Sequence, residues 1–315
     1  MMLGFTNSTM EINTSLPLDD EKMLRFEMHS LINIFSVLIS NLYELEELTG
    51  KPELVEKALS SLHQAGRTIT SKHSNLLNDR YVEQLNLEIL TAVENSKIYL
   101  KNDAGQKFQG VIEHILQIFN LRIEEMQRGN SELGKWLSFS IEEFKKDFDL
   151  FFDAVAKNSR GKYRIVDNPE EKTDNDYLIQ FEVNAEHSNH IIMPLALKDV
   201  IRDLLANARK YTPRGGTISA EIHQNNEELC INIEDNGHGI PESEIKDVVK
   251  YGFRGSNVRD QIRTMGGGVG LTKAYFVTKS LDGRMWIDSA LEKGTKIRIE
   301  VPVPADKKRS SNTLI

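Results

Sequence analysis

Apolar residues recur at alternating steps of three and four in the first part of the chain, a spacing that places them on one face of a helix. Acidic residues at 19–21 predict the start of this helix, and the segment Thr49-Gly50-Lys51-Pro52 predicts its end. A second periodic segment then extends to about Asn78. The two segments predict a helical hairpin whose apolar seam needs a partner helix. The seam residues are Leu24, Met28, Leu31, Phe35, Leu38, Leu42 and Leu45.

Helical periodicity continues over residues 80–129, with a break expected near 101–106 and a stop at Arg128-Gly129-Asn130. A further helix is predicted from Ser131 to about Asn158. After residue 159 the period changes to the alternation that is typical of strands. The pattern therefore predicts an α+β chain, in which an N-terminal helical hairpin or bundle precedes an α/β sandwich domain.

These changes of pattern divide the chain into four segments. We expect an irregular or disordered N-terminus over 1–18 and a helical region with extra helices over 19–135. We expect the α/β domain over 136–305 and a disordered polar tail over 306–315. The helices beyond the hairpin would be either part of a larger bundle or a regulatory insert, and the sequence leaves both open.

Three clusters of polar and glycine residues stand out in the second domain. Asp203, Asn207 and Lys210 are spaced by four and three residues, so they share one face of a helix. An alternating strand ends in the segment Asp235-Asn236-Gly237-His238-Gly239, where a carboxylate is followed by a tight glycine turn. The glycine-rich segment 266–271 precedes a predicted helix, and free amides at a helix N-terminus bind phosphate. No Walker-type phosphate loop is present in the sequence.

In this order, and with Tyr251-Gly252-Phe253-Arg254 between the last two, these segments resemble the four conserved boxes of the histidine-kinase ATP-binding domain. That domain belongs to the superfamily of gyrase, the heat-shock chaperone and MutL. The resemblance covers about residues 140–304 and implies that the cofactors are ATP and Mg²⁺. The nucleotide-binding residues that it implies are Asn207, Lys210, Tyr211, Asp235, Gly237, Gly239, Phe253, Arg254, Gly266, Gly268, Gly270, Leu271 and Thr295.

The resemblance also implies a role for particular side chains. Asp235 would accept a hydrogen bond from the exocyclic amine of adenine, a group that guanine replaces with a carbonyl. Asn207 would give its carbonyl oxygen to Mg²⁺, which prefers hard oxygen ligands. Lys210 and Arg254 would approach the phosphates, and Tyr211 would pack near the base.

The same family carries its phosphoacceptor histidine on the first helix of the hairpin, where this chain has His29. Asn33 follows one turn later and matches the polar residue that the family uses to manage phosphohistidine. The chain departs from the family at Ser30, where an acidic residue is common, and at Ile34, where a proline is usual.

Three other histidines are further candidates for functional residues. His114 follows Glu113 and is the next candidate acceptor. His187 and His190 have a spacing that metal ligands use, but they lack acidic or cysteine partners apart from Glu186, so we expect them to be loop histidines.

The resemblance implies a histidine kinase that phosphorylates itself and passes the phosphoryl group to a response-regulator receiver domain on another chain. A homodimer through the seam, and a regulatory partner protein, are further expectations. Two alternatives stay open. Asp203, four residues before Asn207, would serve as the base of an ATPase or a serine kinase. Ser30 and Ile34 instead fit a non-catalytic scaffold that binds ATP.

The composition of the chain mainly excludes certain partners and certain kinds of site. The net charge of −8 and the pI near 5.6 give no overall attraction to nucleic acid or to an anionic membrane. The single cysteine, Cys230, excludes a disulfide within the chain. The most apolar stretch, Leu31–Leu42, is interrupted by polar residues and too short to span a membrane. We expect no membrane span and a cytoplasmic location.

Overall fold

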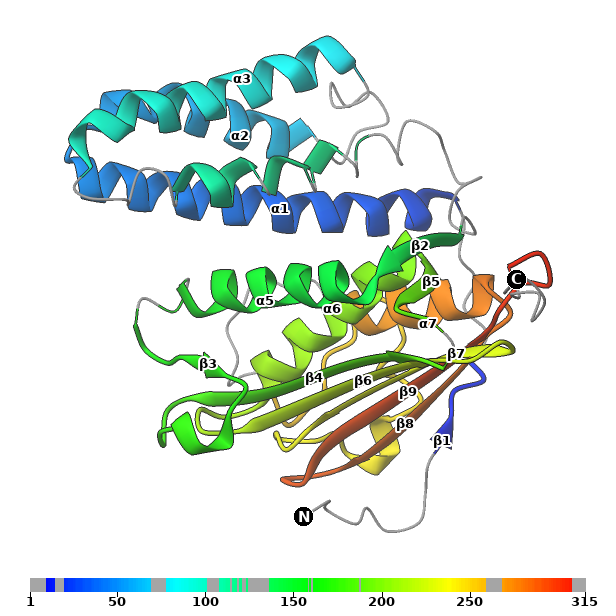
Figure 1. Ribbon diagram of the computed structural model, residues 1–315. Helices are drawn as coiled ribbons and strands as arrows, with labels where there is room; N and C mark the ends of the chain where they lie inside the picture. Colours follow the sequence, from blue (N-terminus) through cyan, green and yellow to red (C-terminus); the bar gives the residue numbers. More distant parts are fainter. Residues whose placement is uncertain are drawn as a thin grey trace. The chain divides into compact units, whose positions relative to one another are not determined.

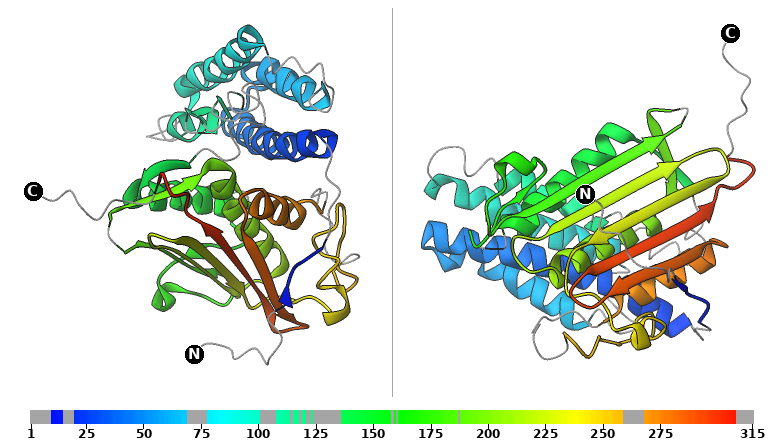
Figure 2. Two further views of the ribbon diagram at one scale, coloured as in Figure 1. Left: turned by 90° about the vertical axis from the view of Figure 1, so that its right-hand side faces the viewer. Right: turned by 90° about the horizontal axis from the view of Figure 1, so that it is seen from below.

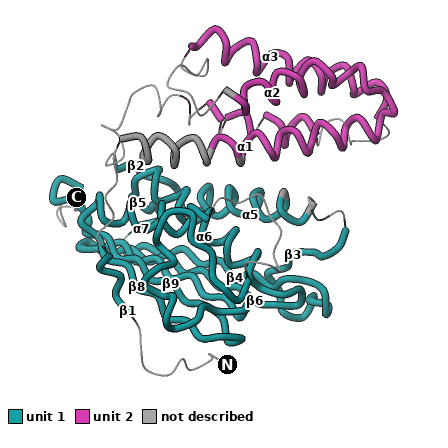
Figure 3. The backbone as a smooth tube through the Cα atoms, turned by 180° about the vertical axis from the view of Figure 1, so that it is seen from behind, with its two compact units in different colours: residues 1–16, 133–315 teal, residues 17–132 magenta. Residues whose placement is uncertain are grey.

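The computed structural model describes residues 10–14, 20–68, 78–100, 108–113, 115–117, 119–120, 123, 136–157, 159, 161–186, 188–258 and 268–307. For residues 20–30, 33, 68, 154 and 157 it describes the backbone alone. The chain forms two compact units (Figures 1 and 3). A helical unit comprises residues 17–132, and an α/β unit comprises residues 1–16 together with 133–315. In chain order, the helical unit is therefore inserted into the α/β unit.

The helical unit begins with the predicted hairpin. Helix α1 (Asp20–Thr49) ends at a turn in which the Gly50 N–H donates to Glu46 O at 2.9 Å. A short 3₁₀ turn, η1 (Pro52–Leu54), leads into α2 (Glu56–Thr68). Helix α3 (Asp79–Ser96) is capped by the Asn78 side chain and is followed by η3 (Lys97–Tyr99). Most of the described residues between 108 and 123 are also helical.

One hydrophobic core joins α1, α2, α3 and the described residues between 108 and 123. Leu38, Leu42 and Leu45, from the predicted seam, are fully buried in it. The ring of Phe35 lies 5.5 Å from that of Phe119, a residue of the last segment. The extra helices are thus part of a larger bundle. From Leu31 to Leu45, the buried seam residues are covered within the chain, and the homodimer stays a prediction.

The α/β unit has a seven-stranded sheet with helices on one face. The strand order is β1-β8-β9-β7-β6-β4-β3, in which β3, β4 and β6 are parallel and the other neighbours are antiparallel. A separate pair is formed by β2 and β5. Figure 2 shows from two further sides that α5, α6 and α7 cover the same face of the sheet. The strands are β1 (Met10–Glu11), β2 (Trp136–Ser140), β3 (Ile165–Val166), β4 (Tyr177–Ala185), β5 (His190–Pro194), β6 (Thr217–Gln224), β7 (Glu228–Asp235), β8 (Arg284–Ala290) and β9 (Gly294–Pro302); the helices are α5 (Ile141–Lys157), α6 (Leu195–Tyr211) and α7 (Gly270–Ser280), with 3₁₀ turns η5 (Pro169–Glu171) and η6 (Glu242–Glu244).

Alternation along the strands creates the core of this unit. In β7 every second residue is buried, from Leu229 through Ile231 and Ile233 to Asp235. The apolar members of this series pack with buried residues of α6, including Leu204 and Leu205. The same alternation therefore places a carboxylate on the buried face at the end of the strand.

Two predicted elements need correction. The helix expected from Ser131 begins at Ile141, because residues 136–140 form β2 and pair with β5 along its whole length. The helical pattern lies in the residues that follow β2. In β2 itself, backbone pairing with a distant strand outweighs the local preference for a helix.

The N-terminus expected to be irregular over 1–18 contains an ordered strand. Met10 pairs with Ile287 of β8, and the Ile12 N–H donates to Met285 O at 2.9 Å. The side chain of Ile12 is fully buried. Sequence alternation over so few residues gives no usable signal, so this pairing was missed.

No helix in the described part of the chain is both long and apolar enough to cross a membrane.

Candidate functional site

The α/β unit contains a cavity of about 90 Å³ bounded by α6, the sheet, the start of α7 and the chain after β7. Its lining is largely apolar, with a few polar groups, as is usual for small-molecule sites. The lining residues are Leu204, Asn207, Ala208, Tyr211, Ile233, Asp235, Gly239, Ile240, Val248, Phe253, Arg254, Gly255, Asn257, Val258, Leu271, Thr295 and Ile297.

Asp235 is the buried carboxylate of this cavity. It is the last residue of β7, and only 9% of its surface is exposed. Burial raises its pKa from 3.8 to about 6, although the Gly237 N–H donates to its Oδ1 at 2.9 Å and favours the charged form. A carboxylate in such a place is a strong acceptor for a donor group on a bound ligand.

The turn after Asp235 is built around Gly239. This residue has φ 65°, and a Cβ there would lie 1.9 Å from Ala290 O. Only glycine therefore fits. The Ile240 N–H donates to Ser289 Oγ at 2.9 Å, and Ser289 Oγ donates in turn to Gly294 O at 2.8 Å. These bonds hold the turn against the β8–β9 hairpin, so that it forms one wall of the cavity.

A second glycine brings α7 close to α6. A Cβ on Gly270, the first residue of α7, would lie 2.7 Å from Nδ2 of Asn207. Leu271 follows and lines the cavity. The N-terminus of α7 and the Asn207 amide thus meet at one edge of the cavity, and a helix N-terminus favours an anionic group.

Two cations lie at the cavity edge. Arg254 lines the cavity, and Lys210 has a pKa below its ordinary value because of burial and the nearby charges of Arg254 and Arg209. The Lys210 ammonium also lies 5.0 Å from the centre of the Tyr211 ring. The two positive charges repel each other, and a bound polyanion would relieve this repulsion.

The structure brings most of the predicted site residues together. Eight of them line the cavity: Asn207, Tyr211, Asp235, Gly239, Phe253, Arg254, Leu271 and Thr295. Lys210, Gly237 and Gly270 contact these residues or influence their charge without lining the cavity. Gly268 approaches Phe253, since a Cβ there would lie 2.7 Å from Phe253 O.

Four predicted residues are not placed. The side chains of His29 and Asn33 lie outside the described residues, although both positions belong to α1. Gly266 and His114 lie outside them altogether. Their roles stay predictions.

Asp203 does not line the cavity. Its Oδ2 accepts a hydrogen bond of 2.8 Å from Lys273 Nζ, an ion pair that links α6 to α7. Asp199 lies 3.9 Å from the same ammonium. This geometry fits a structural link between the helices better than a base that abstracts a proton from a ligand.

Sequence reasoning missed the apolar part of the site. Leu204 and Ala208 precede or follow Asn207 on α6, and Ile233 lies two residues before Asp235 on β7, so helix and strand periodicity would have found them. No periodic pattern in the sequence indicates that Asn257 belongs to the site. It lies in a segment without regular structure, and its Nδ2 donates to Gly239 O at 3.0 Å.

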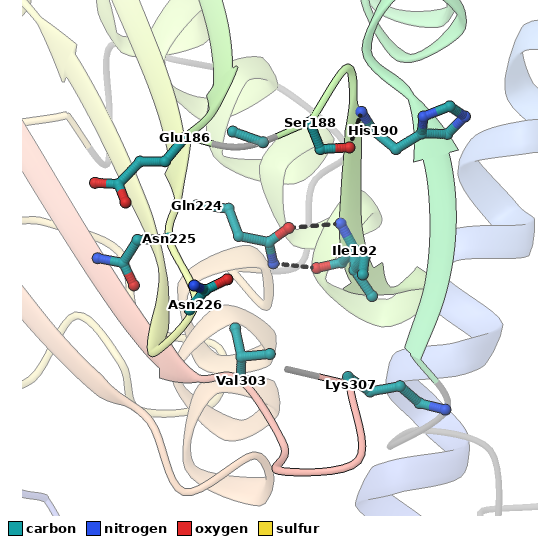
Figure 4. Close-up of a pocket in the computed structure, with 10 residues that line it drawn as sticks. Glu186, Ser188, His190, Ile192, Gln224, Asn225, Asn226, Val303 and Lys307 are labelled. Carbon is teal, nitrogen blue, oxygen red and sulfur yellow. Dashed lines mark hydrogen bonds between the residues drawn. The ribbon is translucent and has the colours of Figure 1, made fainter. Parts of the chain in front are cut away.

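A second, small cavity lies near His190, which is the first residue of β5 and not a loop residue (Figure 4). The Gln224 side chain beside it is fully engaged, because it accepts from the Ile192 N–H at 2.7 Å and donates to Ile192 O at 2.6 Å. His190 Nδ1 is 2.8 Å from Asn189 Oδ1. Within the described residues, no three His, Cys, Asp or Glu side chains are grouped to hold a metal. His187 lies outside those residues.

Part of the α/β unit is similar to known proteins. Residues 193–305 match the family described as histidine kinase-, DNA gyrase B-, and HSP90-like ATPase. The adaptive-response sensory kinase SasA of Synechococcus sp. (strain JA-3-3Ab) is 36% identical over 111 residues, which are 35% of this chain and 29% of that protein. The SasA of Prochlorococcus marinus (strain MIT 9303) is 24% identical over 262 residues, 82% of this chain and 68% of that one. A structure of the mycobacterial sensor histidine kinase MprB covers 54% of this chain and 97% of that chain, at 22% identity and a TM-score of 0.36.

Residues 193–305 of the α/β unit are thus similar to this family of ATPases, and the similarity implies ATP binding. Over about a third of its length, the chain is similar to sensor histidine kinases. The match to the Synechococcus protein spans less than a third of that protein's length.

Proposed function

We propose that this protein is an ATP-dependent histidine kinase, which phosphorylates itself at His29 and passes the phosphoryl group to an aspartate of a response-regulator receiver domain. The observation that supports it most is the convergence of Asp235, Asn207 and Arg254 on one cavity at the N-terminus of α7. Sequence similarity to sensory kinases supports histidine as the phosphoacceptor.

The cavity offers a distinct group to each part of ATP. Asp235 accepts from the adenine amine, and the apolar lining, with Ile233 and Ile297, packs against the base. Lys210, Arg254 and the start of α7 balance the phosphate charge.

A magnesium ion fits this site only together with the nucleotide. Asn207 supplies one hard oxygen, and the described residues contain no cluster of carboxylates that would bind the ion alone. Mg²⁺ commonly takes its other ligands from phosphate oxygens and water. When bound, it neutralises charge on the phosphates.

The chemistry requires little beyond positioning. The lone pair of an unprotonated imidazole nitrogen of His29 forms the N–P bond, while the bond from the γ-phosphorus to the bridging oxygen breaks and ADP leaves with that electron pair. The side chains around the cavity hold the donor in place, which lowers the entropic part of the barrier.

Incubation with γ-labelled ATP and Mg²⁺ tests this function. We expect an acid-labile, alkali-stable label on the protein that is lost in His29→Gln. His63→Gln is the matched control, because His63 is an exposed histidine of α2. A His29→Gln protein that still takes up acid-labile label at the normal rate would refute His29 as the acceptor.

The same experiment separates the alternatives. An acid-stable label would indicate a serine kinase, and free phosphate without label would indicate an ATPase. The ion pair of Asp203 with Lys273 speaks against both, since each needs Asp203 as a base. Binding of ATP without turnover would indicate a scaffold.

We propose further that a receiver domain and a regulatory protein are the partners and that the protein acts in the cytoplasm. These proposals rest on kinship to two-component kinases. Transfer of label from the phosphorylated protein to a candidate receiver domain tests the first.

A further inference from the structure

We infer that Glu244 and Asn257 are positioning residues for Arg254, which they hold at the nucleotide cavity. They do so by clamping the segment 253–258 against the glycine turn that follows β7. The inference rests on the proposed function, in which Arg254 balances the phosphate charge of ATP, and it says what keeps that side chain in place. The segment, the turn and both clamping side chains belong to the α/β unit.

The clamped segment has no regular structure that would fix its position. The described residues 245–258 form turns and bends, with no helix or strand, although most of the segment 253–258 lines the cavity. Asn207 and Lys210 differ in this respect, because α6 determines where their side chains project. The position of Arg254 therefore depends on bonds between its segment and other parts of the unit.

The first clamping bond joins the segment to the glycine turn. Asn257 Nδ2 donates to Gly239 O at 3.0 Å, and His238 O lies 3.5 Å from the same nitrogen. The turn is itself held in place, because the Ile240 N–H donates to Ser289 Oγ of β8 at 2.9 Å. Asn257 thus ties the segment to a fixed wall of the cavity.

The second clamping bond comes from a side chain outside the cavity lining. Glu244, the last residue of η6, accepts a hydrogen bond of 3.0 Å at Oε2 from the Ser256 N–H. Its own N–H donates to Pro241 O at 2.8 Å, which holds it beside the glycine turn. A hydrogen bond to a carboxylate is stronger than one between neutral groups. Since Glu244 does not line the cavity, it influences a bound nucleotide through the segment that it holds.

The two bonds act close to Arg254 in the chain. They are made by Ser256 and Asn257, two and three residues further on, so they restrict where the backbone of Arg254 can go. The guanidinium lines the cavity, and its positive charge acts on Lys210 and Tyr211 of α6. A group that is ordered before the ligand arrives lowers the entropic cost of binding.

Titration calorimetry of the full chain with ATP and Mg²⁺ tests the inference. We expect Arg254→Ala to lower the affinity at least about tenfold and Glu244→Ala to lower it about threefold, as loss of a single hydrogen bond does. Glu244→Gln keeps an acceptor oxygen and should bind nearly as well as the wild type. Glu242→Ala is the matched control, because it removes an acidic side chain from an exposed position of the same 3₁₀ turn and should not lower the affinity.

The sign of the effect separates the clamp from simple electrostatics. Removal of a negative charge near a polyanion would by itself strengthen binding, so a weaker affinity in Glu244→Ala has to come from the lost bond. Adenosine, which lacks the phosphates, should bind equally well to Glu244→Ala and to the wild type. A general defect of folding would lower both affinities.

Combining Glu244→Ala with Arg254→Ala gives the decisive comparison. The double variant should bind ATP as Arg254→Ala alone does, because a clamp has no effect once the side chain that it positions is gone. Asn257→Ala, alone and combined with Arg254→Ala, should show the same pattern for ATP and serves as a second test if Glu244→Ala folds poorly.

Three results would each overturn the inference: equal losses of ATP affinity with and without Arg254, an equal loss for adenosine, or wild-type ATP affinity in both Glu244→Ala and Asn257→Ala. All of these are binding measurements. Failure of the proposed kinase function is seen separately, as wild-type protein that binds ATP but takes up no label from γ-labelled ATP.

Discussion

The burial of Asp235 favours ligand binding but lowers the stability of the folded protein without a ligand. Burial raises its pKa from 3.8 to about 6, so the folded protein favours the neutral carboxyl. The stabilisation from that neutral form is complete below about pH 4 and is lost as the pH rises through 6. Above pH 6 the empty protein therefore holds an ionised carboxylate at a cost of about 3 kcal/mol.

Asp235→Asn should remove that cost. We expect its unfolding free energy at pH 7.5, without nucleotide, to exceed the wild-type value by up to about 3 kcal/mol, with little difference at pH 4. Denaturant unfolding at the two pH values measures this. Asp174→Asn, at an exposed position, is the control and should change neither value. A lower stability of Asp235→Asn at pH 7.5 would contradict the argument.

The same carboxylate should make ATP binding depend on pH. Protonation below about pH 6 turns one acceptor oxygen into a hydroxyl donor, so wild-type affinity should fall as the pH drops through that range. Titration calorimetry with ATP from pH 5 to 8 measures the effect. Asp235→Asn should bind weakly at every pH, and an equal pH dependence in both proteins would exclude Asp235 as its source.

Gly270 should be intolerant of a side chain for a reason of space. A Cβ there would lie 2.7 Å from Asn207 Nδ2, so Gly270→Ala should displace the Asn207 amide. We expect the affinity for Mg·ATP to fall about tenfold, equivalent to ~1.4 kcal/mol. Binding of ATP without Mg²⁺ should change less, because the displaced group is the proposed ion ligand. Gly110→Ala is the control, since a Cβ there meets nothing within 4 Å.

At the scale of single elements, β1 is the one that changes how the chain is divided. It adds an edge strand beside β8 and places Ile12 in the core of the α/β unit, far in sequence from its partners. The first strand of the α/β unit therefore precedes the helical unit. An edge strand of two residues has few backbone bonds, so its stability depends more on the buried side chain of Ile12, which follows it.

Ile12→Ala should test this dependence. Removal of a fully buried isoleucine side chain costs about 2–5 kcal/mol, so the α/β unit should unfold at a clearly lower denaturant concentration. Asn13→Ala, at the exposed neighbouring position, should leave the midpoint unchanged. Equal midpoints for the two variants would mean that β1 contributes nothing to the stability of the unit.

At the scale of the whole molecule, the helical unit behaves in the structure as a folded body with a core of its own. Its buried residues come from α1, α2, α3 and the segment near 112–123. A core completed within one chain predicts unfolding that does not depend on protein concentration, whereas a core shared by two chains predicts the reverse.

The variant Leu42→Ala tests whether the core of the helical unit is complete within one chain. We expect it to lower the stability of the helical unit by about 2–5 kcal/mol, with the same shift at low and at high protein concentration. Glu47→Ala, at an exposed position of the same helix, is the control. Circular dichroism during denaturant unfolding measures both, and a shift that shrinks as the protein is concentrated would point to a shared core.

Much of the nucleotide site was predictable because its signals are local. The spacing of Asn207 and Lys210 on a helix, the position of Asp235 at the end of an alternating strand, and the turn glycine Gly239 each involve only a few neighbouring residues. Backbone geometry alone converts such spacings into a shared face or a buried position. The resemblance to a known family then joined the separate signals into one site.

Contacts between distant parts of the chain were decided by the tertiary structure. The pairing of Met10 with Ile287, and the cover that Phe119 gives to Phe35, bring together residues whose types are common everywhere in the chain. Side-chain type indicates that a residue will be buried, but not against which partner. For this reason the amino-acid pattern predicted the apolar seam correctly from Leu31 to Leu45, while folding alone determined that this part of the seam is covered within the same chain.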